Sequence, residues 1–349
     1  MTRYPVREKS FPMEIPPLDQ ALADRFGRSL ICNLSLSSKE LFHSNFLGWL
    51  LENSPDFARR FLGDRSPVKK VDREKLNFDL LVQTGNGVHV IENKVKSTPD
   101  LDQLVAYEAK MTKVYGKGTL TLLSLMDPPG DFRQKLKNLR VVRYDEISKW
   151  ISETEFPAEH QQAVHEYQFL ISVLLSIHQV AANMSSGDSF HFRKEHVSLL
   201  TKMRLFDVAQ KIRYGCFVKS VAERFLSENG AMDFPFEREV GLTRSIGLAS
   251  FKLRLPGQED LLMGIQIQGS SFRRFIESGS GQCMQTNAET LQGITDPWLG
   301  GKLLKFGRPF KYTNHKLQDD ITLHLLQQQT IESLDLLLRR SIEFADELG

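Results

Sequence analysis

The chain has 349 residues, of which 41% are hydrophobic and 25% charged, as in ordinary soluble globular proteins and enough for two domains. Its formal net charge of +2 excludes nucleic-acid binding through overall charge, so such binding would need local basic patches and a metal. The three cysteines, Cys32, Cys216 and Cys283, have no paired spacing, which argues against a zinc site or a disulfide framework.

The sequence lacks the marks of a secretory or membrane protein. Residues 1–18 are rich in proline and charge and have no apolar stretch like that of a signal peptide. The most apolar run, 169–182, is interrupted by two serines and a histidine, which favours a buried helix over a membrane span. We therefore expect a cytoplasmic protein without a membrane partner.

The elements predicted for the first half of the chain alternate between helices and strands. Apolar residues at helical spacing predict a helix over 39–62, which Ser37 or Ser38 could cap. The turn signal at 85–87 makes the strands on either side an antiparallel hairpin. The other expected elements are strands at 68–71, 76–84, 88–96, 119–126 and 141–144, a helix over 99–114, and helices to about 183. This order predicts an α/β fold in which a crossover helix makes the sheet mixed.

A polar stretch at 185–188 predicts a boundary between one domain at 1–184 and another at 189–349. The elements expected in the second domain are helices over 195–228, strands at 249–255 and 261–268, and an amphipathic helix over 317–345. We therefore expect a C-terminal α+β domain, which would recognise substrate or a partner.

Three charged residues are expected on one face of the hairpin. A turn centred on residues 85 and 86 places Asp79 opposite Glu92, and Lys94, two residues further on, shares that face. Burying such charges costs several kcal/mol each unless they are paired or hold a metal. Two adjacent carboxylates suit Mg²⁺ or Mn²⁺. Lys94 could then orient or deprotonate a water, or stabilise charge on a phosphate.

These residues and their order resemble the PD-(D/E)XK nuclease superfamily, over roughly residues 38–150. The resemblance implies a restriction-endonuclease-like αβββαβ core with a mixed central sheet. Asp79 is similar to the metal-binding aspartate of the second strand. Glu92, Asn93 and Lys94 resemble the E-x-K motif, in which the Asn93 carbonyl would be a further metal ligand. Phe78 stands where the family usually has proline before the aspartate.

Two helices extend the resemblance toward a bacterial branch of the superfamily. Glu40 begins an E-x-x-x-S pattern that ends at Ser44, and it looks like the first-helix glutamate that helps to hold metal or water. Gln103 and Tyr107 resemble the Q-x-x-x-Y helix that supports the site, and their spacing puts them on one helix face. The implied catalytic set is thus Glu40, Asp79, Glu92, Lys94, Gln103 and Tyr107, and the implied metal ligands are Asp79, Glu92, Asn93 and Glu40.

The resemblance implies a metal-dependent nuclease that hydrolyses phosphodiester bonds, with DNA as the preferred nucleic acid and bacterial defence as a biological setting. Fold resemblance alone does not establish activity. The alternative is a catalytically inactive module that binds nucleic acid or protein in the same cleft. The C-terminal domain could also support a homo-oligomer or a protein partner.

Each site assignment has a structural alternative. Asp79 and Glu92 could instead pair with Lys94 and Lys96 in a salt-bridge cluster. Glu40 could be a first-turn residue favoured by the helix dipole. The glutamine and tyrosine of the second helix could serve only as hydrogen-bonded packing.

A basic segment in the second half is a candidate nucleic-acid contact. Residues 301–316 combine lysine and arginine with aromatic residues, and no acidic residue occurs between Asp296 and Asp319. Such a mixture suits a phosphate backbone and exposed bases, whereas a solvated loop is the alternative. The candidate contact residues are Lys302, Lys305, Arg308 and Lys311.

Overall fold

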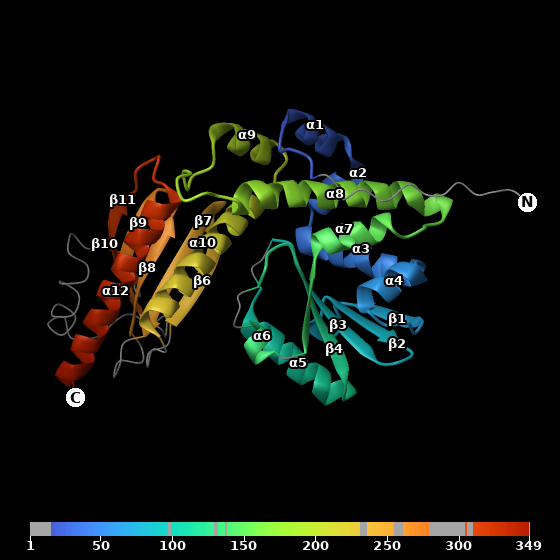
Figure 1. The fold of residues 1–349 in the computed structure, drawn as a ribbon, viewed down its shortest axis with the longest axis horizontal. Coiled ribbons are helices and arrows are strands. Elements are labelled where there is room, and N and C mark those ends of the chain that lie inside the picture. Colours follow the sequence, from blue (N-terminus) through green and yellow to red (C-terminus); the bar gives the residue numbers. More distant parts are fainter. Residues whose placement is uncertain are drawn as a thin grey trace, which may run out of the picture. The chain divides into compact units, whose positions relative to one another are not determined.

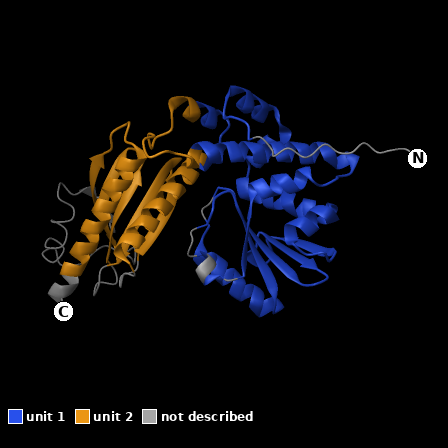
Figure 2. Cartoon of the chain, in the orientation of Figure 1, with its two compact units in different colours: residues 1–180, 198–208 blue, residues 181–197, 209–349 orange. Residues whose placement is uncertain are grey.

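The computed structural model describes residues 15–96, 99–128, 132–136, 138–230, 236–254, 261–278, 304–305 and 310–348. Its contacts divide the chain into two compact units (Figure 2). The first unit comprises Met1–Val180 and Ser198–Val208, and the second comprises Ala181–Val197 and Ala209–Gly349. The domain limits expected above, 1–184 and 189–349, stay a prediction, because a division by contacts does not show that either part folds alone.

The first unit is built on a five-stranded mixed sheet (Figure 1). In spatial order its strands are β1 (Val68–Arg73), β2 (Leu80–Thr84), β3 (Val88–Lys94), β4 (Gly118–Ser124) and β5 (Leu139–Arg143). The first three strands pair antiparallel, whereas β4 is parallel to both β3 and β5. Helix α5 (Leu101–Tyr115) is the crossover between β3 and β4. The predicted αβββαβ core with a mixed sheet is confirmed.

Helices lie against both faces of this sheet. Leu104 and Met111 of α5 share an apolar core with Leu81, Val90 and Leu120 of the strands. Helix α3 (Lys39–Asn53) contacts β1 and β3. The remaining helices of this part of the chain are α1 (Gln20–Arg28), α2 (Leu30–Ser35), α4 (Pro55–Leu62), α6 (Phe132–Lys135), α7 (Tyr144–Ser152), α8 (Ala158–Ala182) and α9 (Lys194–Lys202). Among the described residues, no helix is long and apolar enough to span a membrane.

Two local predictions need correction. The single helix expected over 39–62 is interrupted at Ser54, whose side chain accepts a hydrogen bond from the Phe57 N–H and caps α4, with Pro55 in its first turn. Such a Ser-Pro pair starts a new helix rather than continuing one. The strand expected at 76–84 begins only at Leu80, because Leu76 and Asn77 adopt left-handed conformations in a 3₁₀ turn.

The second unit contains a six-stranded antiparallel sheet. In spatial order the strands are β10 (Leu304–Lys305), β11 (Phe310–Lys316), β9 (Ser271–Ser278), β8 (Leu261–Gln268), β7 (Ile246–Arg254) and β6 (Phe236–Thr243). Helices α10 (Phe206–Asn229) and α12 (Leu323–Leu348) lie along one face of the sheet (Figure 1) and complete an apolar core with β7, β8 and β9. The expected α+β architecture is confirmed, although residues 310–316 form a strand rather than a loop.

Candidate active site

The β2–β3 hairpin brings the three predicted charged residues together. Its register pairs Leu80 with Ile91, as expected, so Asp79 enters the sheet beside the end of β3. The Asn93 N–H donates to Asp79 Oδ2 over 2.7 Å. Lys94 Nζ lies 2.7 Å from Glu92 Oε1, and the Glu92 side chain is almost fully buried. Two carboxylates and one ammonium therefore converge in an apolar sheet.

The charges at this point perturb one another. Burial and the neighbouring Asp79 carboxylate raise the pKa of Glu92 to about 7, although Lys94 partly opposes the rise. Burial likewise raises the pKa of Asp79, against the opposing effects of the Asn93 N–H and Lys94. Burial favours neutral Lys94, but the hydrogen bond to Glu92 and the negative charges of Glu92, Glu40 and Asp79 together outweigh it and raise the pKa of the ammonium. The two carboxylates therefore ionise together only at a cost in free energy.

One carboxylate oxygen at this site is available to a cation. Glu92 Oε2 is buried and has no hydrogen-bond partner. The carboxyl groups of Glu92 and Asp79 lie close enough to share a hydrogen bond if one of them is protonated. Paired anionic oxygens of this kind fit Mg²⁺ or Mn²⁺, with the Asn93 carbonyl as a further candidate ligand. Among the described residues, no three histidine, cysteine, aspartate or glutamate side chains are already grouped as metal ligands.

Glu40 approaches from the first turn of α3. Its Oε1 accepts a hydrogen bond from the Lys96 N–H, just beyond the end of β3, over 3.2 Å. Its charge contributes to raising the pKa of Asp79 and of Glu92. Glu40 therefore lies at the same end of the sheet as the other carboxylates, and its assignment as a ligand stays a prediction.

The Asn93 side chain connects three elements behind the site. Its Oδ1 accepts from the Tyr144 hydroxyl over 2.8 Å. Its Nδ2 donates to Ser44 Oγ over 3.1 Å and to the Glu40 carbonyl over 3.2 Å. Because these groups are buried, the network holds α3 and the start of α7 against β3. Tyr144 was not among the predicted site residues, and its only signal was its place as the last residue of a predicted strand.

Gln103 and Tyr107 act on the turn before Asp79. Gln103 Nε2 donates to the Tyr107 hydroxyl over 2.9 Å, and that hydroxyl donates to the Asn77 carbonyl. The Tyr107 ring packs edge-to-face on Phe78 at 5.0 Å. Because left-handed non-glycine residues cost of order 1 kcal/mol each, these contacts support the unfavourable backbone that presents Asp79. No described hydrogen bond joins either side chain to the carboxylates.

Lys110 was not among the predicted residues, yet it supports the same turn. Its Nζ donates to the Leu76 carbonyl over 2.6 Å and lies 5.7 Å from the centre of the Phe78 ring. A lysine on the same face of α5, three residues after the tyrosine, is the signal that could have identified it.

The predicted nucleic-acid residues lie partly outside the described structure. Lys302 and Arg308 fall outside the described residues, and Lys305 lies in β10, of which only the backbone is described. Lys311 lies in β11, where it pairs with Ile276 in the second unit. Their role stays a prediction.

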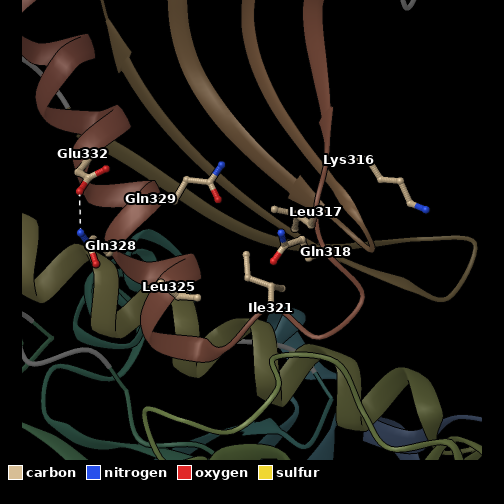
Figure 3. Close-up of a pocket in the computed structure, with 8 residues that line it drawn as sticks. All are labelled: Lys316, Leu317, Gln318, Ile321, Leu325, Gln328, Gln329 and Glu332. Atoms are coloured by element: carbon tan, nitrogen blue, oxygen red, sulfur yellow. Dashed lines mark hydrogen bonds between the residues drawn. The ribbon is translucent and has the colours of Figure 1, made fainter.

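A pocket in the second unit offers no comparable chemistry. It has a volume of about 420 Å³ and lies between the end of β11 and the first turns of α12 (Figure 3). Leu317, Ile321 and three glutamines contribute to its lining, and the Gln328 amide donates to Glu332 over 2.8 Å. Since its lining includes no histidine, cysteine or paired carboxylates, we assign it no catalytic role.

Comparison with known proteins agrees with this geometry. Residues 31–172 match the family model described as the PD-(D/E)XK nuclease superfamily. The matched segment contains Glu40, the hairpin, α5 and Tyr144. Searches of curated proteins and of solved structures returned no match. Residues 31–172 therefore resemble the PD-(D/E)XK nuclease superfamily both in sequence and in the architecture of their sheet.

Proposed function

We propose that this protein is a metal-dependent nuclease that hydrolyses phosphodiester bonds in DNA. Members of that superfamily usually hydrolyse phosphodiester bonds and generally use divalent metal ions, usually Mg²⁺. The observation that carries the proposal is the buried, unpartnered Glu92 Oε2 beside the carboxylate of Asp79. A divalent cation would offset the repulsion that this pair of carboxylates otherwise suffers.

Asp79, Glu92 and the Asn93 carbonyl would hold Mg²⁺ or Mn²⁺, with Glu40 contributing from α3. When bound, such an ion stabilises negative charge on a phosphate and lowers the pKa of nearby water. Lys94 would donate hydrogen bonds to the attacking water and to a phosphate oxygen. Because its pKa is raised, the side chain stays an ammonium, which favours orientation and charge stabilisation over deprotonation of the water.

The basic segment is proposed to contact the phosphate backbone. Lys302, Lys305, Arg308 and Lys311 lie within a stretch that contains no acidic residue, and aromatic residues alternate with them. Cations arranged in this way neutralise phosphates, while aromatic rings offer stacking surfaces to exposed bases.

One observation favours the inactive alternative. The ion pair of Lys94 with Glu92 partly compensates the buried charge without a metal. A protein that kept this pair in the presence of nucleic acid would bind substrate in the cleft without cutting it. Catalysis must therefore be measured separately from binding.

The test is cleavage of plasmid and single-stranded DNA by the full chain with Mg²⁺ or Mn²⁺, and the loss of cleavage in EDTA. Glu92→Gln and Asp79→Asn should abolish cleavage while the protein stays folded. Asp56→Asn is the matched control, because it neutralises an exposed carboxylate of α4 in the same unit. Metal-dependent cleavage that survives Glu92→Gln would refute the assigned site, and binding without cleavage would establish the inactive alternative.

A further inference from the structure

A second charged cluster lies next to the candidate active site, around a residue outside the matched segment. Asp207, at the start of α10, belongs to the first unit. Lys39 Nζ lies 2.8 Å from both of its carboxylate oxygens, and Lys96 Nζ lies 2.7 Å from Oδ2. Two ammonium groups thus share one carboxylate.

Both lysines are tied to the rim of the site through Glu40. Lys39 precedes Glu40 in the first turn of α3, and the Lys96 N–H donates to the Glu40 carboxylate. Lys96 also lies two residues beyond Lys94, past the end of β3. The cluster is therefore at the end of the sheet where the carboxylates converge.

The two lysine ammonium groups form an anion-binding site, which the Asp207 carboxylate occupies. Burial alone would raise the pKa of Asp207, but the hydrogen bonds and positive charges of the two lysines together outweigh it and lower the pKa, so the carboxylate is charged. A phosphodiester group carries a similar single charge on two oxygens, and lysine ammonium groups are common phosphate ligands. The Lys96 side chain is 33% exposed, so an anion can reach the cluster from solvent.

We propose that Lys39 and Lys96 bind a backbone phosphate of the nucleic acid next to the cleaved bond, and that Asp207 occupies this phosphate site in the free protein. This inference rests on the proposed function, because it assigns a second contact for the same substrate. The phosphate takes the place of the Asp207 carboxylate between the two ammonium groups. Asp207 thereby lowers the affinity for nucleic acid and restricts binding to a backbone that can also reach the metal site.

The test is the affinity of the full chain for labelled single-stranded and duplex DNA, measured by fluorescence anisotropy in EDTA, where no cleavage occurs. Asp207→Asn removes the competing carboxylate and should tighten binding about three- to tenfold at low salt, with a salt dependence steeper by about one counterion. Lys39→Met combined with Lys96→Met should weaken binding by a similar factor. In that double variant, Asp207→Asn should have no further effect, because the residue acts through the two lysines.

Asp24→Asn is the matched control for net charge. Asp24 is paired with Lys202 over 2.8 Å in the same unit, and both side chains are about half exposed. Its replacement adds the same charge to the protein but leaves the cluster intact. Binding should therefore change less than about twofold, since an isolated surface charge is screened by salt.

Several outcomes would overturn the inference. An Asp207→Asn protein that is folded and binds DNA no more tightly than Asp24→Asn would make the cluster a structural tie. Unchanged binding by the lysine variant would have the same meaning, even if Asp207→Asn did not fold. A protein that shows the Asp207 effect but never cuts DNA would refute the nuclease proposal and leave Lys39 and Lys96 as the phosphate contact of a binding module. A protein that cuts DNA but binds it no more tightly after Asp207→Asn would refute this inference and leave the nuclease proposal standing.

Discussion

Replacing Asp79 by asparagine should stabilise the metal-free protein in alkaline solution. The pKa of Glu92 is raised from 4.5 to about 7 by burial first and by Asp79 second. At about 1.4 kcal/mol for each pH unit, that rise corresponds to a cost of about 3 kcal/mol for ionised Glu92 in the folded chain. Since burial is the larger cause, the share of Asp79 is about 1 kcal/mol, which corresponds to a melting temperature about 2–4 °C higher in the variant.

The pH dependence identifies the cause. A carboxyl whose pKa is raised on folding destabilises the protein fully above its folded pKa, and this destabilisation is lost as the pH falls toward the unfolded value. For Glu92 that window runs from about 7 down to 4.5. The gain from Asp79→Asn should therefore be present above the window and disappear toward its lower end. The asparagine keeps an oxygen that can accept from the Asn93 N–H, so this hydrogen bond is not the variable.

The assay is thermal unfolding of the wild type and the variant, monitored by circular dichroism in EDTA at several pH values across this window. Asp56→Asn provides the control for loss of an exposed carboxylate. A variant that is less stable than the wild type by the same amount at every pH would refute the reasoning. Asp79 would then be a structural partner of Lys94 and the Asn93 backbone.

Three further predictions concern the same site. Mg²⁺ or Mn²⁺ affinity should fall up to about tenfold per pH unit below about pH 7, because Glu92 must lose its proton to bind the ion. Calorimetry in buffers of different ionisation enthalpy should detect the proton that is released on metal binding. Lys94→Met should reduce the cleavage rate at saturating DNA yet leave metal affinity largely intact, since an ammonium is not a ligand; a collapse of metal affinity would remove its assigned role. Tyr144→Phe should lower the free energy of unfolding in urea by about 1–3 kcal/mol, because the Asn93 Oδ1 acceptor stays buried without its donor; an unchanged value would mean that water replaces the hydroxyl.

The hairpin could be predicted because its information is local. A glycine-containing turn and two-residue alternation together determine which side chains share a face, so the placement of Asp79, Glu92 and Lys94 followed from their numbers alone. The order of helix, hairpin, crossover helix and strand then predicted the mixed sheet.

The second sheet was harder to predict because polar residues occupy core-facing positions. In β9, the alternate residues Phe272, Arg274 and Ile276 pair with buried apolar residues of β8. An arginine therefore interrupts the apolar alternation of β9. Arg274 is accommodated because its guanidinium donates to Ser333 of α12 over 3.3 Å. That partner is 59 residues away in sequence, and no local pattern reveals it.

The sequence by itself determined the identity of the charged hairpin and the order of elements around it, because turn chemistry and side-chain periodicity act over a few residues. Only the tertiary structure decided what surrounds that hairpin. Tyr144 reaches Asn93 across 51 residues, and Asp207 reaches Lys39 across 168. Contacts of this kind depend on how helices pack against the sheet and leave no spacing signal in the chain, so the supporting network and the second charged cluster became visible only in three dimensions.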